Sequence, residues 1–432
     1  MWATLRDKDF SIFTFSQTVS QFGDKLDYIA LIGLIGLFPA SRTPFLLSLL
    51  LIFVTLPGLI FGPLAGVLVD RWHKKTVMVI CDVLRMICAI CIPVCFLVTG
   101  NIYLVYGVVF VMFLITLFFN AARSAIIPNL VAKDQILKAN SVVNFVSRGA
   151  TVLGMFIGGL IVDWSMWPRL IGMEGWIVAF IVDAITFGVS AFMLYVMKVR
   201  ISEALGSTPH LKARGLWLMF CKSLSRVWQD LKHAIAVIFH EHRIGYAMIS
   251  ILFLVIAAGM IYVLVIPTVQ KEMAWGTSGV GKLAAIGAFG LLIGAWLVGL
   301  FGHRIDLRNL MVICFIVFGG VLTTFPLLSN FWLFAIATFV GGVAISPVFI
   351  GQDTIIHQYA HEFVRGRMFS IRDWILNGSF ALVTLIIGAL TVITTKVVLF
   401  VAVGILLAVL SIISWIVFVY GKKGTSIPPH NT

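Results

Sequence analysis

The chain has 432 residues, of which 60% are hydrophobic and only 11% are charged. Its mean hydropathy is +1.07, which is too apolar for a soluble protein of this length, so we expect the bilayer to be its main solvent. The formal net charge of +13 would also suit a nucleic-acid-binding protein. The basic residues fall mostly in short connections between apolar runs, however, which indicates membrane topology and excludes nucleic acid as the expected partner.

About twelve apolar runs are long enough to cross a membrane as helices. They lie at roughly 10–38, 44–69, 76–99, 102–122, 139–164, 173–197, 244–267, 280–301, 309–328, 331–356, 368–392 and 396–420. The runs divide six and six around the longest polar segment. We therefore predict an all-α membrane protein with six-helix bundles at 1–198 and 244–420, a cytoplasmic linker with an amphipathic helix at 199–243, and a disordered cytoplasmic tail at 421–432.

The basic residues are distributed unevenly between the two sides of this topology. Of the 31 Lys and Arg residues, 23 fall on the side that holds the termini and the central segment, and five fall on the other side. By the positive-inside rule, both termini and the central segment are expected in the cytoplasm.

The two halves also carry related sequences. Ala125–Asn129 followed by Asn140–Val142 aligns without gaps on Thr354–Gln358 followed by Phe369–Ile371. Parallel repeats of six helices are typical of secondary transporters, which bind substrate between the repeats near the bilayer midplane. The repeat therefore predicts a transporter that works by alternating access.

Several predicted helices carry charges far from their ends. A charge at the bilayer centre costs about 2.5–3.5 kcal/mol on insertion scales, so it is expected to face a partner or a water-filled cavity. Gln21, Asp24 and Tyr28 share one face of the first predicted helix at three- and four-residue spacing. We predict that a substrate and proton-coupling network consists of Asp24, Asp27, Gln21, Tyr28, Arg148 and Asp183. The alternative is a structural ion-pair cluster that only stabilises the N-terminal half.

The connection Gly66–Lys75 reads Gly-Val-Leu-Val-Asp-Arg-Trp-His-Lys-Lys. It resembles the signature loop of the major facilitator superfamily, Gly-x-Leu-x-Asp-Arg-x-Gly-Arg/Lys-Lys, between the second and third helices, with His73 where that family usually has glycine. The resemblance implies the major facilitator fold of two pseudo-symmetric six-helix bundles. It also implies a cytoplasmic gate that latches the two halves. Our expected gate residues, including two from nearby helix ends, are Gly66, Asp70, Arg71, Lys75, Arg85 and Arg123.

Several segments resemble the macrolide-efflux and siderophore-exporter group of twelve-helix drug–proton antiporters. These segments are Ser20–Asp24, Ile127–Leu130, Lys138–Ser141, Gly154–Gly159 and Arg365–Arg367. Met155 stands where the antiporter motif has proline. The resemblance implies proton-coupled efflux of a hydrophobic or amphipathic compound across a bacterial inner membrane.

Two alternatives remain open from the sequence. The segments around Asp24 and Leu137–Trp164 also resemble bacterial lysophospholipid transporters, which flip a lipid. The second alternative is a transporter-like sensor or scaffold without flux. An enzyme is not expected, because no loop is long enough for a catalytic domain and no nucleophile–base pair stands out. We expect a monomer without cofactors, whose partners are a small amphipathic or lipid-like substrate, protons and membrane lipids.

Asp353, His357 and His361 recur every four residues on the predicted tenth helix. This spacing makes them weak candidates for ligands of a soft divalent cation. The alternative is the end of a helix in the cytoplasm, where histidines are favoured near the C-terminus.

Overall fold

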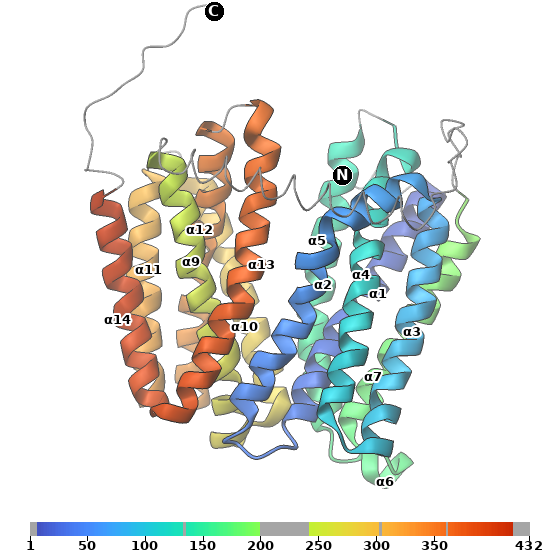
Figure 1. The fold of residues 1–432 in the computed structure, drawn as a ribbon, viewed down its shortest axis with the longest axis horizontal. Coiled ribbons are helices and arrows are strands. Elements are labelled where there is room, and N and C mark those ends of the chain that lie inside the picture. Colours follow the sequence, from blue (N-terminus) through green and yellow to red (C-terminus); the bar gives the residue numbers. More distant parts are fainter. Residues whose placement is uncertain (1–6, 133–134, 199–241, 302–304, 360–361, 418–432) are drawn as a thin grey trace, which may run out of the picture. The chain divides into compact units, whose positions relative to one another are not determined.

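The computed structural model describes residues 7–132, 135–198, 242–301, 305–359 and 362–417, and within these ranges it contains no β-strand. The N-terminal half contains α1 (Lys8–Ile35), α2 (Thr43–Arg71), α3 (Lys74–Thr99), α4 (Ile102–Leu130), α5 (Ile136–Asp163), α6 (Trp167–Ile171) and α7 (Gly175–Val196). The C-terminal half contains α9 (His242–Met260), the π-helical turns η3 (Ile261–Val265) and η4 (Thr268–Glu272), α10 (Gly276–Phe301), α11 (Leu307–Thr324), α12 (Phe331–Tyr359), α13 (Glu362–Ile393) and α14 (Lys396–Trp415) (Figure 1).

Eleven helical segments of the described chain are long and apolar enough to cross a membrane. The remaining long helix, α1, has 28 residues and a length of about 42 Å, which also suffices to span the bilayer. It is less apolar than the others because it carries Asp24, Lys25 and Asp27. The predicted all-α class with twelve spanning helices is thus confirmed.

Most predicted helix boundaries lie within a few residues of the observed ones, and two larger differences are at the end of α4 and the start of α13. α4 continues to Leu130, beyond the end expected at 122, and α13 begins at Glu362, ahead of the start expected at 368. The predictions followed the apolar stretch, which marks the membrane-spanning part. A helix satisfies its own backbone hydrogen bonds and therefore can extend past that part into polar sequence such as Arg123 and Ser124.

The described residues form two compact units of contacts. The first unit comprises those within Met1–Arg226 together with Val265–Ala285, and the second comprises those within Val227–Leu264 and Ile286–Thr432. The end of η3, η4 and the start of α10 therefore pack with the N-terminal helices. The predicted linker at 199–243, apart from the first residues of α9, and the tail at 421–432 lie outside the described residues, and the domain boundaries at 198 and 244 remain predictions.

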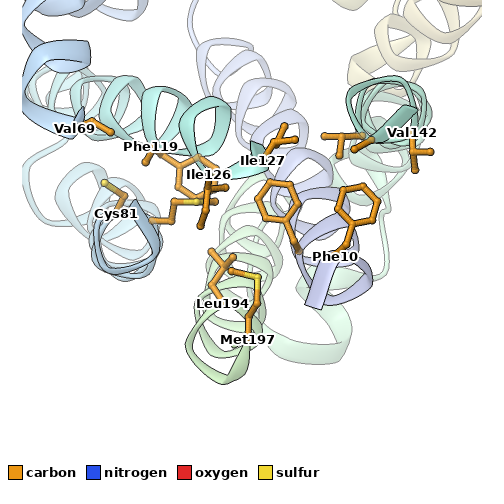
Figure 2. Close-up of a cluster of buried hydrophobic side chains, with 14 residues drawn as sticks. Phe10, Val69, Cys81, Phe119, Ile126, Ile127, Val142, Leu194 and Met197 are labelled. Carbon is orange, nitrogen blue, oxygen red and sulfur yellow. The ribbon is translucent and has the colours of Figure 1, made fainter. Parts of the chain in front are cut away.

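A hydrophobic cluster holds the first unit together where α1 begins and α7 ends. Phe10 on α1, Phe119 on α4 and Leu194 on α7 are each fully buried in it. Figure 2 shows these side chains converging with Val142 of α5 and Val69 of α2. This packing sets the rotation of each helix about its axis, and so decides which side chains face one another nearer the membrane centre.

Glycines allow α1 to lie very close to its two neighbours, α5 and α7. A Cβ atom at Gly23 would collide with Asp183 and Thr186 of α7. One at Gly154 of α5 would lie 2.8 Å from the carbonyl oxygen of Phe22. Such close backbone approach is the usual role of small residues between membrane helices.

Candidate functional site

Arg85 of α3 lies at the centre of a buried polar cluster in the first unit. Its side chain is 0% exposed. Its Nη1 donates to Asp24 Oδ1 of α1 at 3.1 Å, and its Nη2 donates to Ser20 Oγ at 3.1 Å. The same Nη2 also forms a short bond with Asp82, one turn away on α3. The guanidinium group thus links α3 to α1 through Asp24 and Ser20, and its bond to Asp82 lies within α3.

Two aromatic rings enclose the same guanidinium group. Arg85 Cζ lies 4.0 Å from the ring centroid of Phe119 and 4.4 Å from that of Phe187. A planar guanidinium group suits this position because it attracts the ring faces while its edge donates to carboxylates. A lysine would supply charge without either the fork or the stacking surface.

The cluster extends from Asp82 to a pair of serines. Ser190 Oγ of α7 donates to Asp82 Oδ2 at 2.6 Å, and the hydroxyl groups of Ser190 and Ser16 lie 2.9 Å apart. All three side chains are fully buried. α1, α3 and α7 are therefore tied by polar contacts as well as by apolar packing.

Asp27 of α1 and Asp183 of α7 form a second, adjacent group. Their residues are 3% and 0% exposed, and the two carboxyl groups lie within hydrogen-bonding reach of each other. Among the described residues, no hydrogen-bond donor reaches Asp27 Oδ1 or Asp183 Oδ2. A hydrogen bond between two carboxyl groups requires a proton on one of them. This geometry therefore suits a pair that holds one proton between its two members.

Asp24 is the most accessible carboxylate of the cluster. Its side chain is 18% exposed, and its Oδ2 accepts a hydrogen bond from Gln21 Nε2 at 3.0 Å. Tyr28, one turn further along α1, is half-buried. Asp24 thus connects the buried arginine to the accessible side of α1.

Comparison with known proteins identifies the family. The model of the Major Facilitator Superfamily matches residues 13–297 and 247–431, which together cover most of the sequence. The chain belongs to the Major Facilitator Superfamily.

Curated relatives of this facilitator are distant in sequence. It is 25% identical to Macrolide efflux protein A of Enterococcus faecalis over 331 residues, which are 74% of this chain and 94% of the relative. It is 24% identical to the uncharacterized MFS-type transporter YfmI of Bacillus subtilis over 423 residues, 95% of this chain and 96% of the relative. The match to YfiS of the same organism, at 26% identity, spans about half the length of that relative.

Solved structures show the same fold. A bacterial homolog of the human lysosomal transporter Spinster, in an inward-facing and unoccupied conformation, superposes with a TM-score of 0.70 at 13% identity, over 98% of this chain and 99% of that one. The nucleoside transporter NupG superposes with a TM-score of 0.67 at 12% identity, over 96% of this chain and 100% of that one. At these identities the likeness supports the fold alone.

The predicted network of this facilitator is brought together only in part. Gln21, Asp24, Asp27 and Asp183 lie in the cluster, with Tyr28 next to it. Arg148 does not join them, because its side chain is exposed on α5. The cation that pairs with Asp24 is Arg85, which the sequence reasoning had assigned to the gate.

The sequence reasoning grouped Asp82 with Arg85 at the gate, away from the network, and did not single out Ser190. A signal was present for the acidic residue: Asp82 and Arg85 stand one turn apart within the apolar run 76–99, where unpaired charges are costly. Ser190 and Ser16 carry no such signal, since small polar residues are common in membrane helices. Only the packing of α1 against α7 reveals their contact.

Two of the expected gate residues, Arg85 and Arg123, lie in or next to the buried polar cluster. Arg85 contacts Asp24 and Asp82, and its role in the gate stays a prediction. Arg123 is half-buried within α4, near enough to Asp24 and Arg85 for electrostatic interaction.

Lys75 lies on the first unit, where its Nζ donates to the carbonyl oxygen of Tyr195 at 2.7 Å. A Cβ at Gly66 would meet nothing within 4 Å among the described atoms of the first unit, so no contact described there requires this glycine. The side chains of Asp70 and Arg71 lie outside the described atoms. The latch function of the signature loop stays a prediction.

The weak metal candidates do not form a described site. Asp353 is paired with Arg372 of α13 at 3.0 Å, and His357 is exposed. His361 lies outside the described residues. Where the structure describes side chains, it contains no group of three or more His, Cys, Asp and Glu residues that would hold a metal ion.

Proposed function

We propose that this protein is a secondary transporter of the bacterial inner membrane that exports a hydrophobic or amphipathic compound in exchange for protons, by alternating access. Both termini lie in the cytoplasm in this proposal, as the basic residues indicate. Efflux is supported by the similarity to macrolide efflux proteins over most of their length. The protein works as a monomer in this proposal, since a single chain carries both six-helix bundles.

The observation that carries proton coupling is the buried pair Asp27–Asp183. Together with Asp24 and Asp82, these residues place four carboxyl groups near one buried guanidinium group, that of Arg85. Ionisation of all four would leave uncompensated negative charge inside the membrane, which is strongly unfavourable. Binding of a proton by the pair removes part of that charge.

Alternating access links this proton to the substrate. Opening the cluster to water on one side stabilises ionised carboxylates, and closing it favours the protonated pair. Asp24 is accessible enough to meet a substrate, and its shared bond with Arg85 transmits that event to α3. When Asp24 binds substrate, its hydrogen bond to Arg85 breaks and the guanidinium group can move. This movement changes the electrostatic field at the Asp27–Asp183 pair.

The test is substrate accumulation in inverted vesicles with an imposed pH gradient, with a fluorescent hydrophobic cation and a macrolide as substrates. Asp183→Asn and Asp27→Asn are expected to abolish gradient-driven accumulation while leaving exchange of substrate for substrate intact. Asp306→Asn, at the start of α11, is the matched control and is expected to accumulate normally. Normal uphill transport by both variants of the pair would contradict proton coupling through it.

One observation favours the lysophospholipid alternative. A groove of about 350 Å³ in the second unit has an apolar lining that comes mainly from α10, α11 and α12 and includes Phe301, Val317 and Pro347. Such a lining suits an acyl chain. Lysolipid movement that is indifferent to the pH gradient, in the same vesicles, would favour this function over efflux. Absence of any flux would favour a sensor or scaffold.

A further inference from the structure

A cavity of about 380 Å³ lies in the first unit where α1 and α5 end and α7 begins. It lies at the end opposite the hydrophobic cluster around Phe10, where α1 begins and α7 ends. This is the end at which α6 lies in Figure 1. Asp163, Glu174 and Lys271 are its charged lining residues, and Trp164 and Trp176 provide indole rings. The volume is in the range of pockets that hold small organic ligands. The cavity does not include any residue of the Asp27–Asp183 cluster.

Gln270 of η4 presents a buried acceptor at this cavity. The residue is 9% exposed, and its Nε2 donates to the carbonyl oxygen of Ile32 at 3.2 Å and to Thr277 Oγ1 at 3.0 Å. These two bonds use both amide hydrogens and fix the orientation of the side chain. Its Oε1 is left without a partner among the described residues. A buried acceptor of this kind is stabilised by a donor from a bound molecule.

The carboxylates of the cavity each keep one oxygen available. Asp163 Oδ2 accepts from the backbone N–H of Ser278 at 2.5 Å, and Glu174 Oε2 accepts from Trp176 Nε1. In the part of the chain described here, their second oxygens make no other bond. The ammonium group of Lys271 is held by the carbonyl oxygen of Phe38 at 2.7 Å. Two carboxylates against one ammonium leave the lining with net negative charge.

The remaining lining is apolar and aromatic. Leu37 and Val162 contribute aliphatic surface, and Trp164 is 48% exposed. Indole faces attract organic cations more strongly than other side-chain rings do. We propose that this cavity binds an amphipathic organic ammonium ion, with its charge at Asp163 and Glu174, an N–H group toward Gln270 Oε1 and its apolar body against Trp164 and the aliphatic lining. This second ligand site does not depend on proton coupling or on the direction of transport.

The test is calorimetric titration of the full-length protein in nanodiscs with 4-phenylbutylammonium and with its neutral counterpart, 4-phenylbutanol. We expect the cation to bind more tightly than the alcohol. Glu174→Gln, which keeps an acceptor for Trp176, should weaken cation binding about threefold to tenfold and leave the alcohol unchanged. Glu272→Gln removes an equal charge from η4 outside the cavity lining, and should have no such effect.

Two further variants separate this site from general charge effects and from damage to the fold. Asp306→Asn, at the start of α11, should leave the binding of 4-phenylbutylammonium unchanged, because Asp306 belongs to the second unit and does not line the cavity. Ser165→Trp places a large side chain in the lining and should remove the cation-specific part of the binding. Equal affinities for cation and alcohol, or equal effects of Glu174→Gln and Glu272→Gln, would overturn the proposal. So would full binding by Ser165→Trp.

Discussion

Asp27 and Asp183 face each other across the contact of α1 and α7, within hydrogen-bonding reach and almost without exposure. The contact exists because Gly23 lets α7 approach α1 so closely that a methyl group would strike Asp183. The distance between the two carboxyl groups therefore depends on the close packing of α1 against α7. Substitutions of the carboxyl groups and of Gly23 test these two features separately.

The hydrogen bond of the pair predicts different effects of isosteric and apolar substitutions. Asp27→Asn keeps a donor for Asp183, so the free energy of unfolding should change by less than about 1 kcal/mol. Asp27→Leu leaves the Asp183 carboxyl group unpaired and should cost about 1–3 kcal/mol. Thermal unfolding of the purified protein in detergent measures both. An Asn variant as unstable as the Leu variant would show that the carboxyl groups do not bond to each other.

Removal of the buried arginine should be far more damaging. Arg85→Leu leaves Asp24 and Asp82 without their cation, and loss of one partner of a buried ion pair costs about 3–5 kcal/mol. Arg148→Leu is the control, since this arginine is exposed on α5, and should change stability by about 0.5 kcal/mol or less. The unfolding temperature and the yield of folded protein measure the difference. Similar losses in both variants would contradict the pairing described here.

The close approach of α1 and α7 predicts a strict requirement for glycine at position 23. Gly23→Ala would push Asp183 and Thr186 away and should destabilise the protein by about 1–3 kcal/mol, as overpacking does. Gly107→Ala in α4 meets nothing within 4 Å, so it should be neutral or stabilise the helix by up to about 1 kcal/mol. The unfolding temperature should therefore fall for Gly23→Ala and stay the same or rise for Gly107→Ala. Equal unfolding temperatures of the two variants would argue against the close contact of α1 and α7.

The orientation in the membrane follows from the basic residues and is open to a direct test. Alkaline phosphatase, which is active only outside the cytoplasm, should be inactive when fused to Thr432 and active when inserted after Gly172, between α6 and α7. A fluorescent protein that folds only in the cytoplasm should show the reverse pattern. Phosphatase activity at the C-terminus would refute the proposed sidedness.

The membrane class, the twelve spanning helices and the family can be inferred from the amino-acid sequence, because hydropathy is a local property and the signature loop at Gly66–Lys75 is a contiguous motif. It also indicated that Asp24, Asp27 and Asp183 would lie inside the protein, since a charge facing lipid is too costly. These inferences need no knowledge of which helices are neighbours.

Which of these charges contact one another depends on how the helices pack, and the sequence does not predict it. The arginine that pairs with Asp24 is 61 residues away on α3, and the more obvious candidate, Arg148, is exposed on α5. Helix rotation is set by packing over many residues, such as the cluster around Phe119, and is not encoded by any short motif. The same holds for Gln270, whose contact with Ile32 arises because η4 packs with the N-terminal helices.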